Sequence, residues 1–458
     1  MAGGSDESLY LGVDIGGTKV LAALVDEAGK VLVREKCPTP RGVEASAVID
    51  AIEAAIRSAV DSSGQSMDDV RALGVAVPGV VDPKKGRVVV APNMNFDNVD
   101  LGRELRKRLD RKVAIGNDCN LGALGESWLG AGRDAKSVFA MLWGTGIGGG
   151  FVRKGKLWRG ARDSAAEVGH IVMQIGGPEC GCGNLGCFEA LASRTAIERD
   201  IRQAVQSGRP SMITELAEGN LGVIRSGMLR KALEAGDEVV TEIMHRAAEA
   251  VGHACVTVRH LIDPAVVILG GGVIEACGQH LMPTIHRVVD ADRLPGARPG
   301  GDVLISALGD DAVVLGAVAL ARHRIGRSPF RKKYQLEHTY RNVAHPDFGK
   351  VSVGKKSYDC DIYIRACGKV KRRNKDAVRE TTGSSHVIGR DELKKVCRGG
   401  PELLIIGAGD QAQAELNDDG REFLARRNIR YEMLPSPKAV KLYNDSTCRR
   451  ALLLHATC

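Results

Sequence analysis

Four candidate metal ligands fall within one short stretch of the chain, and this stretch limits the possible folds more than any other feature. His170, Cys180, Cys182 and Cys187 follow the spacing His-x9-Cys-x-Cys-x4-Cys. Three thiolates and one imidazole suit a tetrahedral zinc ion with no open position, which is the structural kind of zinc site. Scattered loop cysteines or a disulfide are the alternatives, but Cys180 and Cys182 lie too close in sequence to bridge easily. We therefore expect a structural Zn²⁺ that holds this segment together.

Two carboxylates flank the metal-binding segment. Glu167 precedes His170 by three residues, and Glu189 follows Cys187 by two. Carboxylates accept paired hydrogen bonds from the vicinal hydroxyls of a sugar. The second ring nitrogen of His170 would also be free to face a ligand. A metal ion that fixes this segment would therefore shape a polyol pocket without taking part in the chemistry.

Two strand–glycine turn–strand units follow one pattern and predict phosphate binding. Asp14 precedes one turn, Gly16-Gly17-Thr18-Lys19, and Trp143 precedes the other, Gly144-Thr145-Gly146. Glycine turns expose backbone N–H groups that bind phosphate oxygens, and an acid at a strand end suits hydrated Mg²⁺. Glycines 144, 146 and 149 also fit G-x-G-x-x-G. That dinucleotide motif requires a helix directly afterwards, whereas residues 151–157 predict a strand, a turn and a strand.

Three further turns contain candidate site residues. Asn117-Asp118 lies between a predicted strand, 112–115, and a predicted helix, 121–129, so a helix cap is the alternative to a role in a cleft. Gly270, Gly271 and Gly272 follow a predicted strand and would let an adenosine approach the backbone, although a simple tight turn is also possible. Gly79 and Asn93 lie in loop turns whose residue types alone are uninformative.

At these motifs the sequence resembles the ROK family (repressors, open reading frames and sugar kinases), and in particular its glucokinases, over about residues 8–325. The resemblance implies an α/β, actin-like (ribonuclease H-like) two-lobed ATPase fold with lobes at 8–115 and 116–310 and a return helix at 311–325. It implies Asp118 as the catalytic base. It implies sugar contacts from Gly79, Asn93, Asn117, Asp118, Glu167, His170 and Glu189, and nucleotide contacts from Asp14, Gly16, Gly17, Thr18, Lys19, Gly144, Thr145, Gly146, Gly270, Gly271 and Gly272.

Together these features predict an ATP- and Mg²⁺-dependent hexose kinase that phosphorylates D-glucose at its 6-hydroxyl. Fructose, mannose or an N-acetylhexosamine stay open as substrates, because Ala166 stands where the family usually has glycine and Asn95-Phe96 depart from common glucokinase sequences. A non-catalytic sugar sensor is the other alternative. Family repressors carry a winged helix before the first hairpin, whereas nine residues precede Tyr10 here, so we expect an enzyme.

The remaining residues predict a basic linker at 326–345 and a separate small α/β domain at 346–458. Between Gly326 and Lys375 the chain has 14 Lys or Arg against 4 Asp or Glu, which is more typical of a solvated face than of a nucleic-acid site. Short segments of this domain, such as 385–390, 403–409 and 453–458, resemble a protein family that includes an adipogenesis-associated protein and a respiratory-complex assembly factor. That family has no settled activity. The motif from Gly407 to Ala412 is weak support for a dinucleotide, and His386 and His455 are expected to be structural.

Composition excludes several classes of protein. Hydrophobic residues make up 44% and charged residues 26%, as in ordinary globular proteins, and no apolar run has the length of a membrane span. Twelve cysteines without a recognisable export signal suggest a reducing compartment. We therefore expect a cytoplasmic protein and a homodimer, with a hexose as its ligand and with no membrane or nucleic-acid partner. The partner of the C-terminal domain is unknown.

Overall fold

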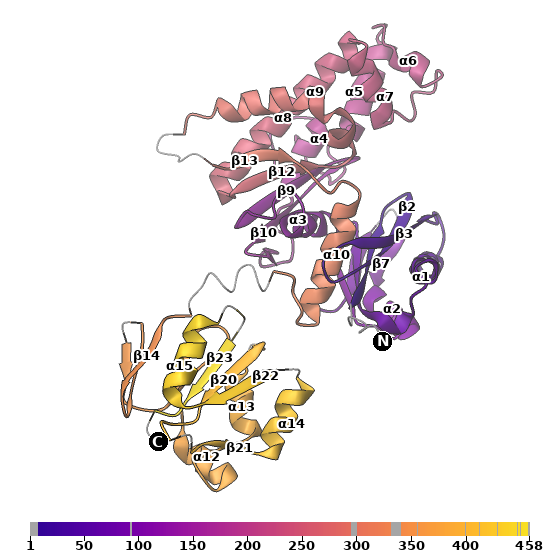
Figure 1. Ribbon diagram of the computed structural model, residues 1–458. Coiled ribbons are helices and arrows are strands. Elements are labelled where there is room, and N and C mark those ends of the chain that lie inside the picture. Colours follow the sequence, from indigo (N-terminus) through magenta and orange to yellow (C-terminus); the bar gives the residue numbers. More distant parts are fainter. Residues whose placement is uncertain are drawn as a thin grey trace. The chain divides into compact units, whose positions relative to one another are not determined.

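The computed structural model describes residues 8–91, 94–294, 300–330, 340–354, 356–398, 400–411, 413–427, 429–446, 448 and 450–456. The chain divides into two compact units, Met1–Pro329 and Phe330–Cys458, which are described separately (Figure 1). Among the helices that the structure describes, none is both long and apolar enough to cross a bilayer.

The N-terminal lobe of the first unit is built on a five-stranded sheet in the order β3-β2-β1-β4-β8. The first three strands are antiparallel neighbours, and β4 and β8 run parallel to β1. Helix α1 packs on β2 and β3 and buries one face that includes Val48, Ile52, Ile56 and Val60. The elements are β1 (Leu9–Ile15), β2 (Lys19–Val25), β3 (Val31–Pro38), α1 (Ala45–Ser62), β4 (Val70–Val77), α2 (Leu101–Leu109) and β8 (Val113–Asn117), with a smaller sheet of β5 (Val80–Asp82), β6 (Arg87–Ala91) and β7 (Phe96–Val99).

The C-terminal lobe repeats this arrangement with the order β11-β10-β9-β12-β13. Its strands are β9 (Ser137–Trp143), β10 (Ile147–Arg153), β11 (Lys156–Leu157), β12 (Val266–Gly270) and β13 (Asp302–Ile305). Because β10 follows the Gly144–Gly146 turn as a strand, the rejection of a dinucleotide motif there is confirmed. The helices are α3 (Asp118–Trp128), α4 (Phe188–Ala192), α5 (Arg194–Gln206), α6 (Ile213–Leu216), α7 (Ser226–Glu234), α8 (Glu238–Ile262) and α9 (Gly272–Asp290).

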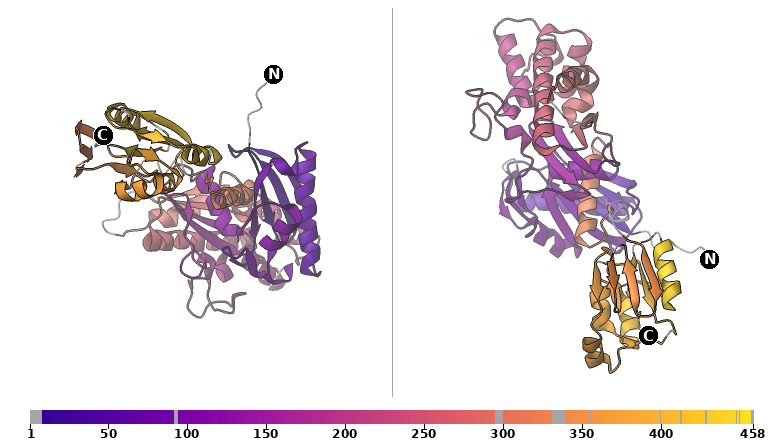
Figure 2. Two further views of the ribbon diagram at one scale, coloured as in Figure 1. Left: turned by 90° about the horizontal axis from the view of Figure 1, so that it is seen from below. Right: turned by 90° about the vertical axis from the view of Figure 1, so that its left-hand side faces the viewer.

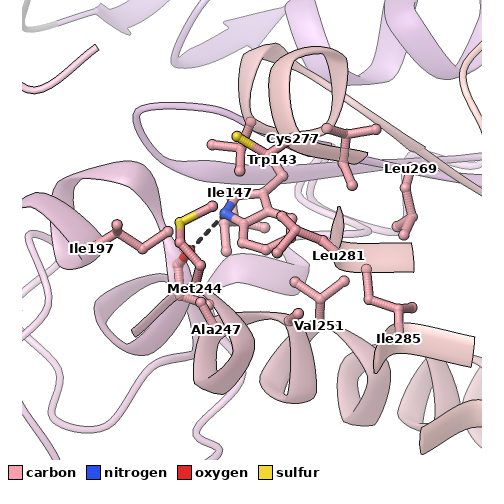
Figure 3. Packing of buried hydrophobic residues seen from close by; sticks show 14 of the residues in the cluster. Trp143, Ile147, Ile197, Met244, Ala247, Val251, Leu269, Cys277, Leu281 and Ile285 are labelled. Atoms are coloured by element: carbon pink, nitrogen blue, oxygen red, sulfur yellow. Dashed lines mark hydrogen bonds between the residues drawn. The ribbon is translucent and has the colours of Figure 1, made fainter. Parts of the chain in front are cut away.

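Trp143 lies at the centre of the core of this lobe, directly before the second glycine turn (Figure 3). Its ring is fully buried among residues of β12, α8 and α9, and its Nε1–H donates to the carbonyl of Ala192 at 2.6 Å. A buried indole needs such a partner for its N–H. The glycine turn therefore starts from a fully buried and hydrogen-bonded side chain.

Helix α10 (Asp311–Arg324) connects the two lobes. It packs against α3 of the C-terminal lobe and against β1 and β4 of the N-terminal lobe. The approach is so close that a Cβ on Gly74 would lie 1.9 Å from the carbonyl oxygen of Ala317, and one on Gly316 would lie 1.7 Å from that of Leu121. Two sheets of matching order joined by one helix confirm the predicted two-lobed fold (Figure 2).

The second unit is a small α/β domain on a sheet of order β18-β17-β23-β20-β22. Its first strand begins at Val343, slightly before the expected boundary at 346, because the N–H and carbonyl of Val343 pair with the Asn444 side chain. The elements are β14 (Val343–Asp347), β15 (Lys350–Val353), β16 (Lys356–Tyr358), β17 (Ile362–Ile364), β18 (Val370–Arg372), α12 (Lys375–Thr382), β19 (Val387–Ile388), α13 (Arg390–Val396), β20 (Leu403–Gly407), β21 (Glu415–Leu416), α14 (Asp418–Arg426), β22 (Arg430–Leu434), α15 (Ser436–Asp445) and β23 (Arg450–Leu454).

Buried charges hold the interior of this small domain together. Arg373 donates two hydrogen bonds to Glu392, at 2.6 and 2.8 Å, and a third to the carbonyl of Ser385 at 2.7 Å. His455 is fully buried beside this arginine, and burial lowers its pKa to about 3. Gly407 is not followed directly by a helix, since β21 comes before α14, so the glycine motif at 407–409 lacks the context that a dinucleotide site needs.

Candidate functional site

The first glycine hairpin joins β1 to β2 and is held from one side by the segment after β3. Its turn closes with a hydrogen bond of 2.8 Å from the N–H of Gly16 to the carbonyl of Lys19. The carbonyls of Gly16 and Gly17 accept hydrogen bonds from Thr39 Oγ1 at 2.7 Å and Arg41 Nε at 2.9 Å. These contacts fix the hairpin beside the Asp14 carboxylate, at the end of β1.

Asp14 lies in an unfavourable electrostatic environment. Burial, followed by the nearby charge of Asp118, raises its pKa to about 7, although Lys19 acts in the opposite direction. A buried carboxylate beside a second carboxylate is stabilised by a divalent cation, because the cation neutralises both. The residues present therefore fit a magnesium site at the position predicted from the sequence.

The second glycine hairpin is connected to the segment that follows the cysteines. The N–H of Ile147 donates to Glu189 Oε2 at 2.7 Å, and a Cβ on Gly146 would lie 2.4 Å from that same oxygen. Arg194, at the start of α5, donates to Thr145 Oγ1 at 2.8 Å. Position 146 therefore tolerates only glycine unless Glu189 moves.

The third glycine turn leads into α9. Gly271 has φ of +89°, and a Cβ there would lie 2.6 Å from the carbonyl oxygen of Trp143. Both the left-handed backbone and the contact require glycine. The turn thus brings the N-terminus of α9 against the end of β9, next to the second hairpin.

Asn117 and Asp118 start α3, and the structure separates their roles. Asn117 is the helix cap, because its Oδ1 accepts from the N–H of Asn120 at 3.0 Å. Its Nδ2 donates to Asp118 Oδ1 at 2.9 Å and to the carbonyl of Gly79 at 3.2 Å. The capping role that sequence reasoning allowed for Asp118 belongs to its neighbour. The carboxylate of Asp118 is oriented by Asn117 and by the N–H of Cys119, at 2.8 Å.

A small pocket of about 30 Å³ lies beside Asn117, lined by residues of both lobes. Of the predicted sugar contacts, Gly79, Asn117 and Glu167 line it. The full lining is Gly79, Val80, Val81, Pro83, Gly116, Asn117, Asn120, Leu157, Arg159, Asp163, Ser164 and Glu167.

Four acidic side chains between the first hairpin and the metal-binding segment interact electrostatically with their neighbours: Asp14, Asp118, Glu167 and Glu189. Asp118 raises the pKa of Asp14, and Glu167 in turn raises that of Asp118, where burial is the larger cause. Burial also raises the pKa of Glu167, which the charge of Glu189 raises further and His170 lowers. The predicted base thus lies between the predicted metal site and the predicted sugar contacts.

The candidate zinc ligands converge as predicted. The ligand atoms of His170, Cys180, Cys182 and Cys187 all lie within 4.8 Å of one another. His170 Nδ1 lies 3.7 Å from Cys180 Sγ, and the sulfurs of Cys182 and Cys187 lie 3.7 Å apart. With Zn–S bonds of about 2.3 Å, the edges of a tetrahedron measure about 3.8 Å, so the donor set fits zinc. Nδ1 faces the thiolates, which leaves Nε2 available on the other side of the ring.

Backbone strain marks the loop between β11 and this cluster. Ala166, directly before Glu167, has φ of +70°, and Asp163 has φ of +56°. A left-handed conformation costs an L-residue about 1–2 kcal/mol, which is why glycine suits position 166. Non-glycine residues held in this conformation concentrate at ligand sites.

Comparison with known proteins agrees with this geometry. The model of the ROK family matches residues 10–324. The chain belongs to the ROK family. A glucokinase of Thermotoga maritima is 36% identical over 319 residues, which cover 69% of this chain and 98% of that one. A ROK glucokinase of Streptomyces griseus, solved with glucose and AMPPNP, has a TM-score of 0.61 at 34% identity and covers 69% of this chain and 99% of its own.

The ROK relatives also include regulators, and the C-terminal unit has a separate match. A xylose repressor of Caldicellulosiruptor bescii is 27% identical over 69% of this chain and 78% of the repressor. The model of a protein family of unknown function, DUF498/DUF598, matches residues 343–451. The expected division into a ROK protein and a small domain of unknown function is therefore confirmed.

Sequence reasoning missed several residues of the site. Asn120 lines the pocket, and among the described residues its buried Oδ1 has no hydrogen-bond partner. Arg159 and Asp163 also line the pocket, from a loop with no distinctive motif. The Asn-Asp-x-Asn spacing was the one available signal for Asn120. Asn93, a predicted sugar contact, lies outside the described residues.

Proposed function

We propose that this ROK protein is an ATP-dependent glucokinase, which transfers the γ-phosphoryl group of ATP to the 6-hydroxyl of D-glucose. The observation that carries the proposal is the position of Asp118: its carboxylate is held at 2.9 Å by Asn117, which lines the pocket, and its charge adds to burial in raising the pKa of Asp14 beside the first hairpin. A base between a phosphate hairpin and a polyol pocket is the arrangement that phosphoryl transfer to a hydroxyl needs. The glucokinases among the relatives support glucose as the acceptor.

Asp118 accepts the proton of the attacking hydroxyl. In a loose transition state this proton leaves late, so a carboxylate is a sufficient base. The raised pKa of Asp118 makes it a stronger base than an exposed aspartate. The amide of Asn117 holds the carboxylate in place through its 2.9 Å hydrogen bond.

The nucleotide binds between the two glycine hairpins, with Lys19 at the end of the first. Asp14 holds Mg²⁺, which would neutralise charge on the phosphates. Gly270, Gly271 and Gly272 receive the adenosine next to the N-terminus of α9, where their lack of side chains leaves the backbone open.

The sugar binds to the predicted contacts Gly79, Asn93, Asn117, Glu167, His170 and Glu189, to which the pocket adds Asn120. An unpaired buried acceptor in a polar pocket is suited to a ligand hydroxyl, so Asn120 Oδ1 accepts one hydrogen bond from the sugar. Glu189 accepts from the N–H of Ile147 through Oε2, and its Oε1, which lies 3.8 Å from Cys180 Sγ, is the oxygen that would accept from a sugar hydroxyl. A zinc ion bound by His170, Cys180, Cys182 and Cys187 would hold Glu167 and Glu189 at their places.

Two alternatives remain part of the proposal. Another hexose could be the acceptor, because the pocket contains Arg159 and Asp163, whose contacts with a sugar are not predicted by the motifs. A non-catalytic sensor is favoured by the repressor relatives but disfavoured by the intact Asp14, Asp118 and glycine hairpins. We also propose a homodimer in a reducing cytoplasm, with no role yet assigned to the C-terminal domain.

The test is ATP consumption by the full chain against glucose, fructose, mannose and N-acetylglucosamine, with product position established by NMR. We expect ADP release that depends on glucose and a 6-phosphate product. Sugar binding without ADP release from any hexose would favour the sensor, and a higher kcat/KM for another hexose would reassign the substrate.

A further inference from the structure

A carboxylate at the start of α10 holds an ammonium group beside the first phosphate hairpin. We propose that Asp310 is a positioning residue for MgATP, which acts by holding Lys19 where the phosphates bind. The proposal deepens the kinase function proposed above and rests on it.

Two lysines from neighbouring strands converge on one oxygen of Asp310. Lys19 Nζ lies 2.9 Å from Asp310 Oδ2, and Lys36 Nζ lies 3.3 Å from the same atom. The register pairs Leu21 with Lys36, so Lys19 and Lys36 are diagonal neighbours on one face of the sheet. Asp310 is 291 positions from Lys19 in sequence, so the contact depends on how α10 packs.

The carboxylate itself is well fixed. Asp310 occupies the N-cap position of α10, a helix of 14 residues whose N-terminus stabilises negative charge, although its side chain makes no capping hydrogen bond. The preceding loop is tied to the buried side chain of Glu126, which accepts from Ser306 Oγ at 2.7 Å and from the N–H of Leu308 at 3.0 Å. Hydrogen bonding to Lys19 lowers the pKa of Asp310, so the carboxylate stays ionised at neutral pH.

The pair lies close to the predicted magnesium and phosphate positions. Lys19 and Asp310 both change the pKa of Asp14, in opposite directions, and both act on Glu275 in the first turn of α9. The two residues are therefore near the end of β1 and near the α9 terminus, which belong to different lobes. The triphosphate of ATP would lie between these two elements.

Holding Lys19 in advance has a specific energetic benefit. A free lysine loses side-chain entropy when it is immobilised. If Asp310 already restricts the side chain, less of this cost is left for the moment of nucleotide binding. The pair is exposed, with side-chain exposures of 44% and 54%, so it contributes little to stability and its loss should be seen in nucleotide binding.

The test compares Asp310→Asn with a matched control, Asp311→Asn. Asp311 is the next residue of α10 and also pairs with a strand of the N-terminal lobe, since it accepts from Arg34 Nε at 2.9 Å, but it has no contact with Lys19 among the described interactions. We expect Asp310→Asn to raise the KM for MgATP about tenfold while the KM for glucose and the Tm stay unchanged, and Asp311→Asn to change the KM for MgATP less than twofold.

A double-mutant cycle with Lys19→Met distinguishes positioning from a general structural effect. In the Lys19→Met background, Asp310→Asn should cause no further rise in the KM for MgATP, and Asp310→Glu in the natural background should restore most of the affinity. An additive loss, an unchanged KM, or a lowered KM, which would mean that the carboxylate competes with phosphate, would overturn the proposal. Calorimetric binding of Mg-AMPPNP without sugar tests Asp310 even if no hexose is phosphorylated.

Discussion

Glu189 accepts a hydrogen bond of 2.7 Å from the backbone N–H of Ile147, which joins the metal-binding segment to the second glycine hairpin. The other oxygen of the same carboxylate lies 3.8 Å from Cys180 Sγ, within the candidate zinc cluster. One side chain therefore contacts both the cluster and the hairpin predicted to bind phosphate. Loss of the metal should disturb nucleotide binding as well as sugar binding.

Replacing Cys182 with serine should remove the zinc. Zinc analysis of the natural protein should give about one ion per chain, and Cys182→Ser should lose it because a structural site needs all four ligands. We expect kcat/KM for glucose to fall more than tenfold and the KM for ATP to rise. Cys367→Ser is the control, since Cys367 is an exposed thiol of the second unit. A zinc-free natural protein with full activity would contradict the prediction.

Replacing Asp118 with asparagine should abolish most turnover. General base catalysis contributes about 10²–10⁴-fold, and asparagine cannot accept the proton. Coupled measurement of glucose-dependent ADP release should show a loss in this range, while glucose binding measured by calorimetry is kept. Asp61→Asn, at an exposed position of α1, should leave turnover unchanged. An Asp118→Asn enzyme with near-normal kcat would exclude Asp118 as the base.

Magnesium dependence should vary with pH. Because the pKa of Asp14 is raised to about 7, a proton competes with Mg²⁺ for this carboxylate below that pH. The Mg²⁺ concentration for half-maximal activity should rise about fivefold between pH 7 and pH 6 and change little between pH 8 and pH 9. It is measured by titrating Mg²⁺ at saturating glucose and corrected for the protonation of ATP. A half-saturation independent of pH would show that Asp14 does not bind the ion.

The same carboxylate should destabilise the protein when Mg²⁺ is absent. A raised folded-state pKa means that the stability contribution of Asp14 is fully present below its unfolded pKa near 3.8 and is lost as the pH rises through about 7. Asp14→Asn removes this loss. In urea denaturation without Mg²⁺, the free energy of unfolding of the variant should exceed that of the natural protein. The difference should grow from pH 5 to pH 8, with an upper limit of about 4 kcal/mol. A constant difference across this range would contradict the assignment.

Two adjacent glycines at the start of α9, the N-cap Gly271 and the first helical residue Gly272, provide a direct test of the nucleotide turn. Gly271→Ala forces a Cβ to within 2.6 Å of the Trp143 carbonyl oxygen at a left-handed φ, so it should lower the free energy of unfolding by about 2 kcal/mol or more. Gly272→Ala meets nothing closer than 3.8 Å, at Ser226 Oγ, and should leave stability within about 0.5 kcal/mol. Urea denaturation at pH 7.5 compares the two. Equal losses of stability in the two variants would mean that the turn can shift to accommodate the alanine at position 271.

The parts of the site that lie within short stretches of chain could be predicted from the sequence. His170, Cys180, Cys182 and Cys187 are separated by few bonds, so their spacing alone restricts them to one small volume, where the structure places them. The glycine hairpins follow from the same logic, because glycine turns between apolar strands have few possible conformations. The two-lobed fold was predictable because the motif resemblance extended along most of the first unit.

Only the tertiary structure decided which distant side chains meet. Nothing near Lys19 in sequence indicates Asp310, and the contact exists because α10 returns to pack on β1 and β4. The structure also showed that Asn117, and not Asp118, accepts the capping hydrogen bond of α3. It likewise placed Arg159 and Asp163 in the lining of the pocket. The geometry of neighbouring residues is limited by the covalent bonds between them, whereas contacts between distant residues depend on how whole helices and sheets pack together. No single motif determines that packing.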